Sequence, residues 1–218
     1  YLVEYPTAFY GEFNKDYVKL PKEVVTTPMK EHQRYFPVSK DGKLLPYFIA
    51  VRNGDKHAID IVKAGNEKVL EARLADALFF YDEDIKKPLE SFVENLKTVV
   101  FQAKLGTVYD KTLRIEKLAQ DIVETLDEKE ILNDTLRAAK LCKADLVTNM
   151  VFEFTELQGV MGREYAKVGG ENDAVAQAIF EHYLPRFAGD ILPQTQEGIA
   201  LSIADKLDSI AGFFAIGI

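Results

Sequence analysis

The sequence is poor in the features of secreted, membrane-spanning or strongly basic proteins. Its single cysteine, Cys142, cannot form an internal disulfide, so we expect a reducing, cytoplasmic setting. No stretch approaches the roughly 20 uncharged apolar residues of a membrane span, so no membrane partner is expected. With 27 Lys and Arg against 35 Asp and Glu, the net charge is −8. A global basic field for nucleic acid is therefore absent, and any RNA contact must come from a local patch.

The common motifs of nucleotide binding and covalent catalysis are also missing. The chain has no glycine-rich phosphate loop, no dinucleotide fingerprint, no His-Glu-x-x-His and no paired cysteines for zinc. Cys142 falls on an apolar stripe, which predicts an inert, buried thiol. These absences give no support to a covalent nucleophile, and we expect no catalytic residue and no cofactor within this chain.

What is present is typical of a folded protein. Hydrophobic residues make up 47% and charged residues 28% of the 218 positions, which excludes a disordered or collagen-like chain. The length allows one large domain or two small ones. The sequence starts on a strand-like pattern without Met and ends on the apolar run at residues 209–218, so we expect an internal piece of a longer protein.

The N-terminal part has the composition of β-strands. Aromatic and β-branched residues predict strands at residues 2–13, 17–20, 24–27, 34–38 and 44–51. The Asp41-Gly42 pair between the last two runs predicts a hairpin. Pro37 and Pro46 indicate edge strands or strand ends, because proline cannot donate to a sheet ladder.

After Gly54 the apolar spacing becomes helical. It predicts helices at residues 60–81, 110–126, 133–148, 173–187 and 195–214. Asn133 is the expected cap of the third, and Pro185 and Pro193 mark helix ends. The predicted class is α+β, with a small antiparallel β part at residues 1–100, including a connecting helix, and an all-helical part at residues 101–218, truncated at its C-terminus.

A local basic patch is the first candidate site. Residues 28–56 hold six basic and three acidic side chains, a balance of +3 in an acidic chain. Lysine and arginine neutralise phosphates, and His32, Tyr35 and Phe36 could stack on unpaired bases. The alternative is a turn whose polar side chains face water and whose aromatic rings fill the core. The pattern alone favours this alternative.

Two carboxylates in apolar surroundings form the second candidate site. Asp145 and Asp205 could share a divalent cation, because a carboxylate is costly to bury without a partner. Alternatively each pairs with a lysine, an arginine or a backbone N–H, and Lys143 and Lys206 are close in sequence. Pairing is the favoured interpretation. His182 is the only histidine of the helical part and predicts a satisfied histidine, because a transition-metal site needs several imidazoles.

Five strings carry a resemblance to a known family. They are PMKEHQRYFP (28–37), YFIAVRNG (47–54), RLADALFFY (73–81), FEFTELQGVMG (152–162) and EHYLP (181–185). With them the chain resembles, over essentially its whole length, the β subunit of the bacterial tetrameric glycyl-tRNA synthetase. The resemblance implies an α-subunit partner in an alpha2beta2 heterotetramer, tRNA(Gly) as substrate, and ATP and Mg used by the α subunit.

The resemblance also implies an editing-like module followed by a helical domain related to the HD phosphohydrolases. The degenerate HD-site positions are Lys111, Ala144, Asp145, His182 and Asp205. The first histidine of the HD pattern falls near Lys111, and its His-Asp pair falls on Ala144 and Asp145. Both histidines are thus lost, which indicates a retired hydrolase scaffold in which Asp145 and Asp205 pair with lysines.

The preferred hypothesis is a non-catalytic part of a two-component aminoacyl-tRNA ligase that helps to position the acceptor arm of tRNA. Its predicted tRNA-facing residues are Lys30, His32, Gln33, Arg34 and Arg52. One alternative is an active metal-dependent phosphohydrolase. A second is a structural module that docks the partner subunit and never touches RNA.

Overall fold

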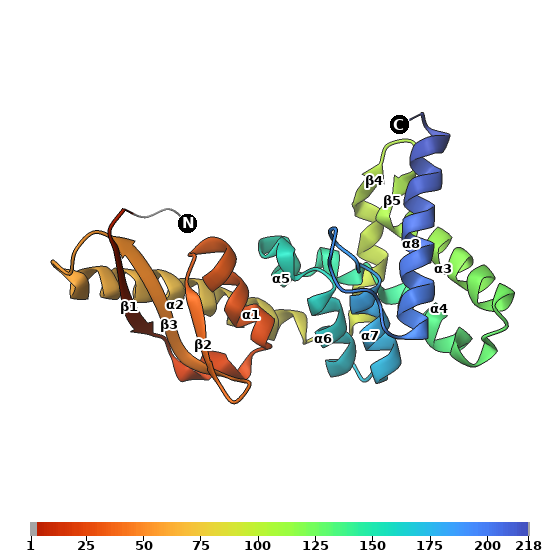
Figure 1. Ribbon diagram of the computed structural model, residues 1–218. Coiled ribbons are helices and arrows are strands. Elements are labelled where there is room, and N and C mark those ends of the chain that lie inside the picture. The colour runs from red at the N-terminus through yellow and green to blue at the C-terminus, as the bar shows by residue number, and fades with distance from the viewer. Residues whose placement is uncertain (1–3, 218) are drawn as a thin grey trace. The chain divides into compact units, whose positions relative to one another are not determined.

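A computed structural model describes residues 4–217 and divides the α+β chain into two compact units, Tyr1–Asp82 and Glu83–Ile218 (Figure 1). The division falls before the boundary at residue 100 that the sequence suggested, because residues 83–100 pack within the helical unit. The predicted first strand begins later than expected, and its positions 2 and 3 lie outside the described residues. So does Ile218.

The first unit contains a three-stranded antiparallel sheet. Its strands are β1 (Pro6–Glu12), β2 (Phe36–Lys40) and β3 (Lys43–Asn53), in the order β1-β3-β2. The predicted hairpin at Asp41-Gly42 is confirmed, and both residues have the positive φ that a tight two-residue turn requires.

The two prolines of the sheet differ in position. Pro37 lies on the edge strand β2, as predicted, but Pro46 lies in the central strand β3. The β2–β3 register shifts between Pro37 and Ser39, and the pairing of β1 with β3 ends at Tyr47. Pro46 therefore sits where neither neighbour requires its missing N–H, which corrects the expectation for this residue.

Two predicted strands are helical instead. Residues 17–20 fall largely in the 3₁₀ turn η1 (Lys15–Lys19), and residues 24–27 fall in α1 (Lys22–Thr27). Val24 and Val25 are completely buried in this helical conformation. The strand propensity of β-branched residues is weak, and burial in the tertiary structure outweighs it here.

The predicted connecting helix is confirmed as α2 (Ile59–Asp84), which runs along the sheet (Figure 1). Its buried residues Leu70 and Leu74 share one face of the helix. On the helix surface, the Glu67 carboxylate accepts a hydrogen bond from the Glu12 backbone N–H at 2.9 Å. This hydrogen bond attaches the helix to the end of β1.

The second unit is helical with one small hairpin that the sequence did not predict. Its elements are η3 (Leu89–Thr98), β4 (Val100–Gln102), β5 (Gly106–Thr107), α3 (Val108–Thr125), η4 (Lys129–Ile131), α4 (Leu132–Leu141), η5 (Ala144–Val147), α5 (Asn149–Glu153), η6 (Thr155–Leu157), α6 (Val160–Val168), α7 (Asp173–Glu181) and α8 (Gln196–Ala215). The helices α3, α4, α7 and α8 pack against one another. The predictions of α3 and α8 are confirmed to within two residues.

Two of the predicted helices are shorter than expected. The helix predicted for residues 133–148 begins at Leu132, so Asn133 is not its cap, and it ends at Leu141. Asp145 consequently lies in the 3₁₀ turn η5 and not on a continuous helical stripe. The helix predicted for residues 173–187 ends at Glu181. The local apolar pattern does not predict that these two helices end early, because both ends depend on contacts with distant segments.

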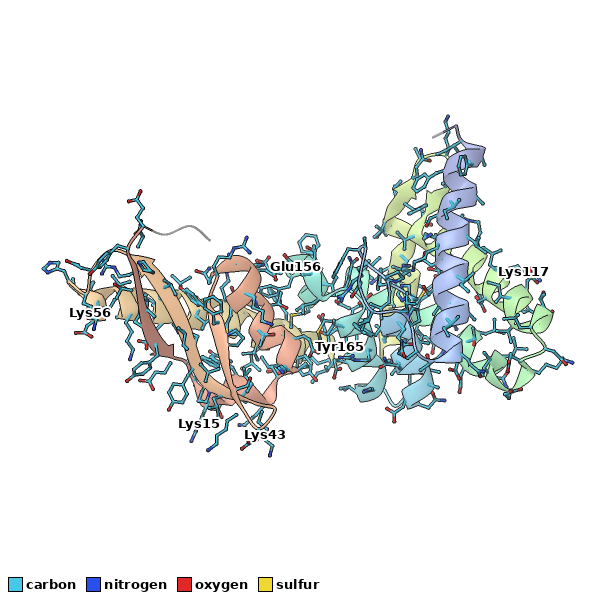
Figure 2. The ribbon with its side chains drawn as sticks, in the orientation of Figure 1. Lys15, Lys43, Lys56, Lys117, Glu156 and Tyr165 are labelled. Atoms are coloured by element: carbon cyan, nitrogen blue, oxygen red, sulfur yellow. The ribbon has the colours of Figure 1, made fainter. Side chains whose placement is uncertain are left out.

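A buried carboxylate joins the last turn of α2 to two helices of this unit. Asp84, at the end of α2, accepts hydrogen bonds from the backbone N–H groups of Asn149 and Met150 at 3.0 and 2.9 Å. It also accepts one from the Tyr165 hydroxyl at 2.9 Å, and Tyr165 is labelled in Figure 2. These bonds fix the N-terminus of α5 and the middle of α6.

Among residues 4–217, no helix has both the length and the apolarity to cross a membrane.

The sheet generates a prediction at Gly11. Gly11 pairs with Phe48 across β1 and β3, and a Cβ at this position would overlap the buried Phe48 ring. We expect Gly11→Ala to lower the free energy of unfolding by about 1–3 kcal/mol, as overpacking does. Gly65→Ala, in the open middle of α2, should instead raise it by about 0.5–1 kcal/mol. Urea unfolding measures both, and equal effects would contradict the close packing.

Candidate nucleic-acid interface and the buried charge cluster

The basic segment of the first unit is a closed turn. The π-helical turn η2 (Pro28–His32) ends at Gln33, and Arg34 adopts a φ of 60° as the chain reverses into β2. The backbone N–H of Tyr35 donates to the carbonyl of the fully buried Met29 at 2.7 Å. Met29 and Tyr35 therefore anchor the turn from inside and leave its charged residues on the surface.

The surface of this turn combines cations with one exposed ring. Lys30 and Arg34 are exposed and, together with Glu31 and Phe36, line a hollow of about 390 Å³. The Arg34 guanidinium lies 3.9 Å from the Glu31 carboxylate. The Phe36 side chain is 55% exposed. Tyr35 is buried and stacks on Phe48 with a 4.6 Å separation of ring centroids, and burial raises the pKa of its hydroxyl. Tyr35 therefore cannot stack on a base, whereas Phe36 can.

The other predicted tRNA-facing residues lie in two places. His32 and Gln33 are half-buried on the same turn as Lys30. Arg52 comes from the end of β3, and its guanidinium Nη1 donates to the carbonyl of His57 at 2.8 Å. Arg52 thus holds the β3–α2 loop. The cations at the tips of other loops, such as Lys43 and Lys56, also point outward (Figure 2).

In the second unit, Asp205 lies between two buried lysines. The Lys111 Nζ is 2.8 Å from Oδ1 of Asp205, and the Lys143 Nζ is 2.9 Å from Oδ2. The lysine side chains are only 5% and 6% exposed. Each carboxylate oxygen therefore faces an ammonium group, and the predicted pairing of Asp205 with lysine is confirmed.

A second carboxylate, Asp208, completes this charge cluster one turn further along α8. Its Oδ2 is 3.0 Å from Lys111 Nζ, and its Oδ1 is 2.5 Å from Arg114 Nε. Three cations thus face two carboxylates. The apolar pattern did not distinguish Asp208, although its position three residues after Asp205 places both on one helical face.

The cluster determines the protonation of its members. Burial alone would raise the pKa of Asp205, but Lys143 and Lys111 outweigh it and hold that pKa below its ordinary value. Burial and the charge of Lys143 lower the pKa of His182 well below its ordinary value. His182 is therefore neutral. Its Nδ1–H donates to the Ile179 carbonyl, and its Nε2 accepts from Lys143 Nζ at 2.8 Å. It is the satisfied core histidine that the sequence predicted.

Asp145 is partnered differently from the prediction. Its Oδ2 accepts hydrogen bonds from the backbone N–H groups of Gly159 and Gly162 at 2.6 and 3.0 Å. Burial raises the pKa of Asp145 to about 6, although these two donors act in the opposite direction. The prediction that Asp145 pairs with a lysine is therefore wrong, and the alternative of backbone N–H donors is correct. The reason is the end of α4 at Leu141, which turns Asp145 toward the start of α6.

Three neighbouring residues have no part in ion binding. Cys142 is completely buried, and burial raises the pKa of its thiol to about 12, as an inert thiol requires. Ala144 is buried and offers no ligand atom. Lys206 donates to the Leu184 carbonyl and the Ser202 hydroxyl, both at 2.7 Å, and not to either predicted carboxylate.

The residues at the HD-site positions do not fit a divalent cation. Both oxygens of Asp205 already face ammonium groups, and the accepting nitrogen of His182 faces Lys143. A divalent ion placed beside these lysines would be repelled by several kcal/mol at the effective dielectric of about 20 that suits protein sites. In the part of the chain that the structure describes, no group of three or more His, Cys, Asp or Glu could hold a metal.

The whole chain, residues 1–218, matches the family described as glycyl-tRNA synthetase beta subunit. The chain belongs to this family. The predicted resemblance is thereby confirmed.

Individual relatives of the glycyl-tRNA synthetase beta subunit family match all of this chain. It is 78% identical over 218 residues to the glycine–tRNA ligase beta subunit of Clostridioides difficile. The corresponding proteins of Desulforamulus reducens and Bacillus subtilis are 61% and 52% identical. Each alignment covers 100% of this chain and 32% of the relative. The chain therefore spans about a third of the length of the curated relatives it matches.

The charge cluster predicts a large cost for removing one ammonium. We expect Lys143→Met to lower the free energy of unfolding by about 3–5 kcal/mol, because it leaves a buried carboxylate partly unpaired. Lys117→Met, which breaks the exposed pair with Asp121, is the control and should change it by less than about 1 kcal/mol. Lys117 is labelled in Figure 2. If urea unfolding showed that Lys143→Met loses as little free energy of unfolding as Lys117→Met, the charge cluster would not be stabilising the fold.

Asp145 predicts a pH-dependent stability of opposite sign to Asp205. Its folded-state pKa of about 6 lies above the ordinary 3.8, so its contribution is most favourable below pH 4 and is lost as the pH rises through 6. Asp145→Asn cannot ionise. From pH 4 to pH 7, we expect the unfolding free energy of this variant to rise relative to the parent by about 2 kcal/mol. A difference that stays constant across this range would exclude the raised pKa.

Proposed function

We propose that this chain is a non-catalytic part of a two-component glycine–tRNA ligase and helps to bind and position tRNA(Gly). A separate α subunit, in an alpha2beta2 heterotetramer, carries out the ATP- and Mg-dependent aminoacylation in the cytoplasm. The observation that carries this proposal is the family match over all 218 residues, with 78% identity to a relative named as a glycine–tRNA ligase beta subunit.

The interior of the helical unit supports a non-catalytic role. At the positions where an HD phosphohydrolase binds its metal, Lys111 and Lys143 pair with the carboxylate of Asp205, and the neutral His182 accepts a hydrogen bond from Lys143. An ammonium group neutralises a carboxylate but cannot activate water as a bound metal does. This arrangement gives the alternative of a metal-dependent phosphohydrolase no support.

The surface of the first unit supports RNA contact at the 28–36 turn. Lys30 and Arg34 are exposed beside the ring of Phe36. The two cations can neutralise phosphates, and an exposed ring can stack on an unpaired base such as those of a tRNA acceptor end. Because the whole chain has a charge of −8, a polyanion would approach through such a local basic surface and not elsewhere.

The experiment measures tRNA binding by the full-length subunit with its α subunit as a function of salt. We expect Lys30→Ala and Arg34→Ala each to weaken binding several-fold and to reduce the slope of log affinity against log salt by about one. Lys117→Ala removes the same charge from the other unit and serves as the control.

Unchanged affinity and slope in both variants would exclude the turn from the tRNA interface. If the same variants instead weakened the association of the two subunits, the second alternative, a module that docks the α subunit, would replace the present proposal. Measuring subunit association by sedimentation in the same buffers separates these outcomes.

A further inference from the structure

The helix α8 exposes a row of large apolar side chains. The row, called here the α8 apolar row, consists of Ile199, Ile203, Leu207, Ile210 and Phe214, which are 41%, 42%, 45%, 54% and 77% exposed. Steps of three or four residues place them on one face of the helix. The opposite face, including Leu201 and Ala204, is buried in the unit. Exposed apolar surfaces of this extent mark interaction sites in soluble proteins.

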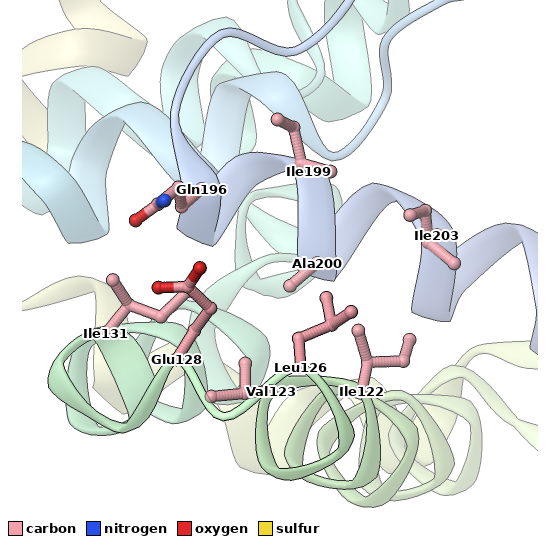
Figure 3. A pocket seen from close by; sticks show the side chains of 9 residues that line it. All are labelled: Ile122, Val123, Leu126, Glu128, Ile131, Gln196, Ile199, Ala200 and Ile203. Carbon is pink, nitrogen blue, oxygen red and sulfur yellow. The ribbon is translucent and has the colours of Figure 1, made fainter.

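A pocket opens beside this row. It has a volume of about 150 Å³ and lies between the start of α8 and the end of α3. Figure 3 shows Ala200 and Ile203 of α8 next to Leu126 and Ile122 of the facing segment, and Ile199 also belongs to the lining. An apolar cavity of this size holds a benzene ring, so the pocket can accept one large aliphatic or aromatic side chain.

The chemistry of this surface favours a protein segment over RNA. No lysine or arginine belongs to the α8 apolar row or lines the pocket, and the one charged residue at the pocket is Glu128. A phosphate group bound there would therefore have no lysine or arginine to pair with. The row follows helical spacing along a 20-residue helix, and a second helix can pack its side chains between such residues.

The length of the relatives indicates where this segment comes from. The chain covers 32% of the curated relatives, so about two thirds of each relative lies outside the matched region. A segment of the same polypeptide is held at high effective concentration and needs no second molecule. We infer that an amphipathic helix from the remainder of the same subunit covers the α8 apolar row and inserts one apolar side chain into the pocket.

The test compares thiol reactivity within the full-length subunit. Ile203→Cys and Leu207→Cys probe the row, and Val168→Cys, at a position 54% exposed on α6, is the matched control. The natural Cys142 is buried and stays silent in the folded state. We expect a maleimide to label the two row variants roughly tenfold or more slowly than the control, because labelling requires local opening. Peptide mass spectrometry measures each rate.

Equal rates at the row and the control would overturn the inference. Protection that is lost on dilution would assign the row to a second copy of the subunit, and protection that appears only with the α subunit would assign it to that partner. Either result also overturns it. Ala200→Leu fills the pocket and, combined with Leu207→Cys, should return labelling toward the control rate. Unchanged protection in this double variant would refute the inserted side chain.

Discussion

The helical unit depends on the pairing of Asp205 with Lys111 and Lys143. A carboxylate that is nearly removed from water needs compensating charge, and here two ammonium groups supply it within 3 Å. The three residues come from α3, the segment after α4, and α8. The same contacts that neutralise Asp205 therefore join three parts of the chain, and Asp208 extends the cluster to Arg114.

In this pairing, lysines neutralise an inward carboxylate without a metal ion. A metal ion and an ammonium group can both neutralise an inward carboxylate, but only the metal can polarise water or a phosphate. The lysines are covalently part of the chain, so the helices are held together without any bound ion. The neutral His182 accepts from Lys143 and completes a network that stabilises the fold and lacks an obvious reactive group.

The two units expose surfaces of opposite chemical character. The first presents a basic turn with Lys30, Arg34 and the ring of Phe36, which suits a phosphate backbone with unpaired bases. The second presents the α8 apolar row, which carries no cation and suits another protein segment. Charge thus distinguishes the two kinds of partner, because phosphates require neutralisation and apolar side chains require exclusion of water.

Features that depend on near neighbours and on family membership could be predicted from the order of the residues. The α+β class, the Asp41-Gly42 hairpin, the long helices α2, α3 and α8, and the inert Cys142 all follow from local spacing or composition. The family assignment rests on strings spread over the chain.

The pairing of residues far apart in the chain could not be predicted in this way and follows from how the helices pack. Burial placed Val24 and Val25 in a helix against their strand propensity, and the end of α4 at Leu141 directed Asp145 to backbone donors and not to a lysine. Lys111 and Asp205 are 94 residues apart, and their contact exists because α3 packs on α8. Periodicity reports which face of a segment is apolar. It carries no information on which other segment meets that face, and this is set by the packing of the whole unit.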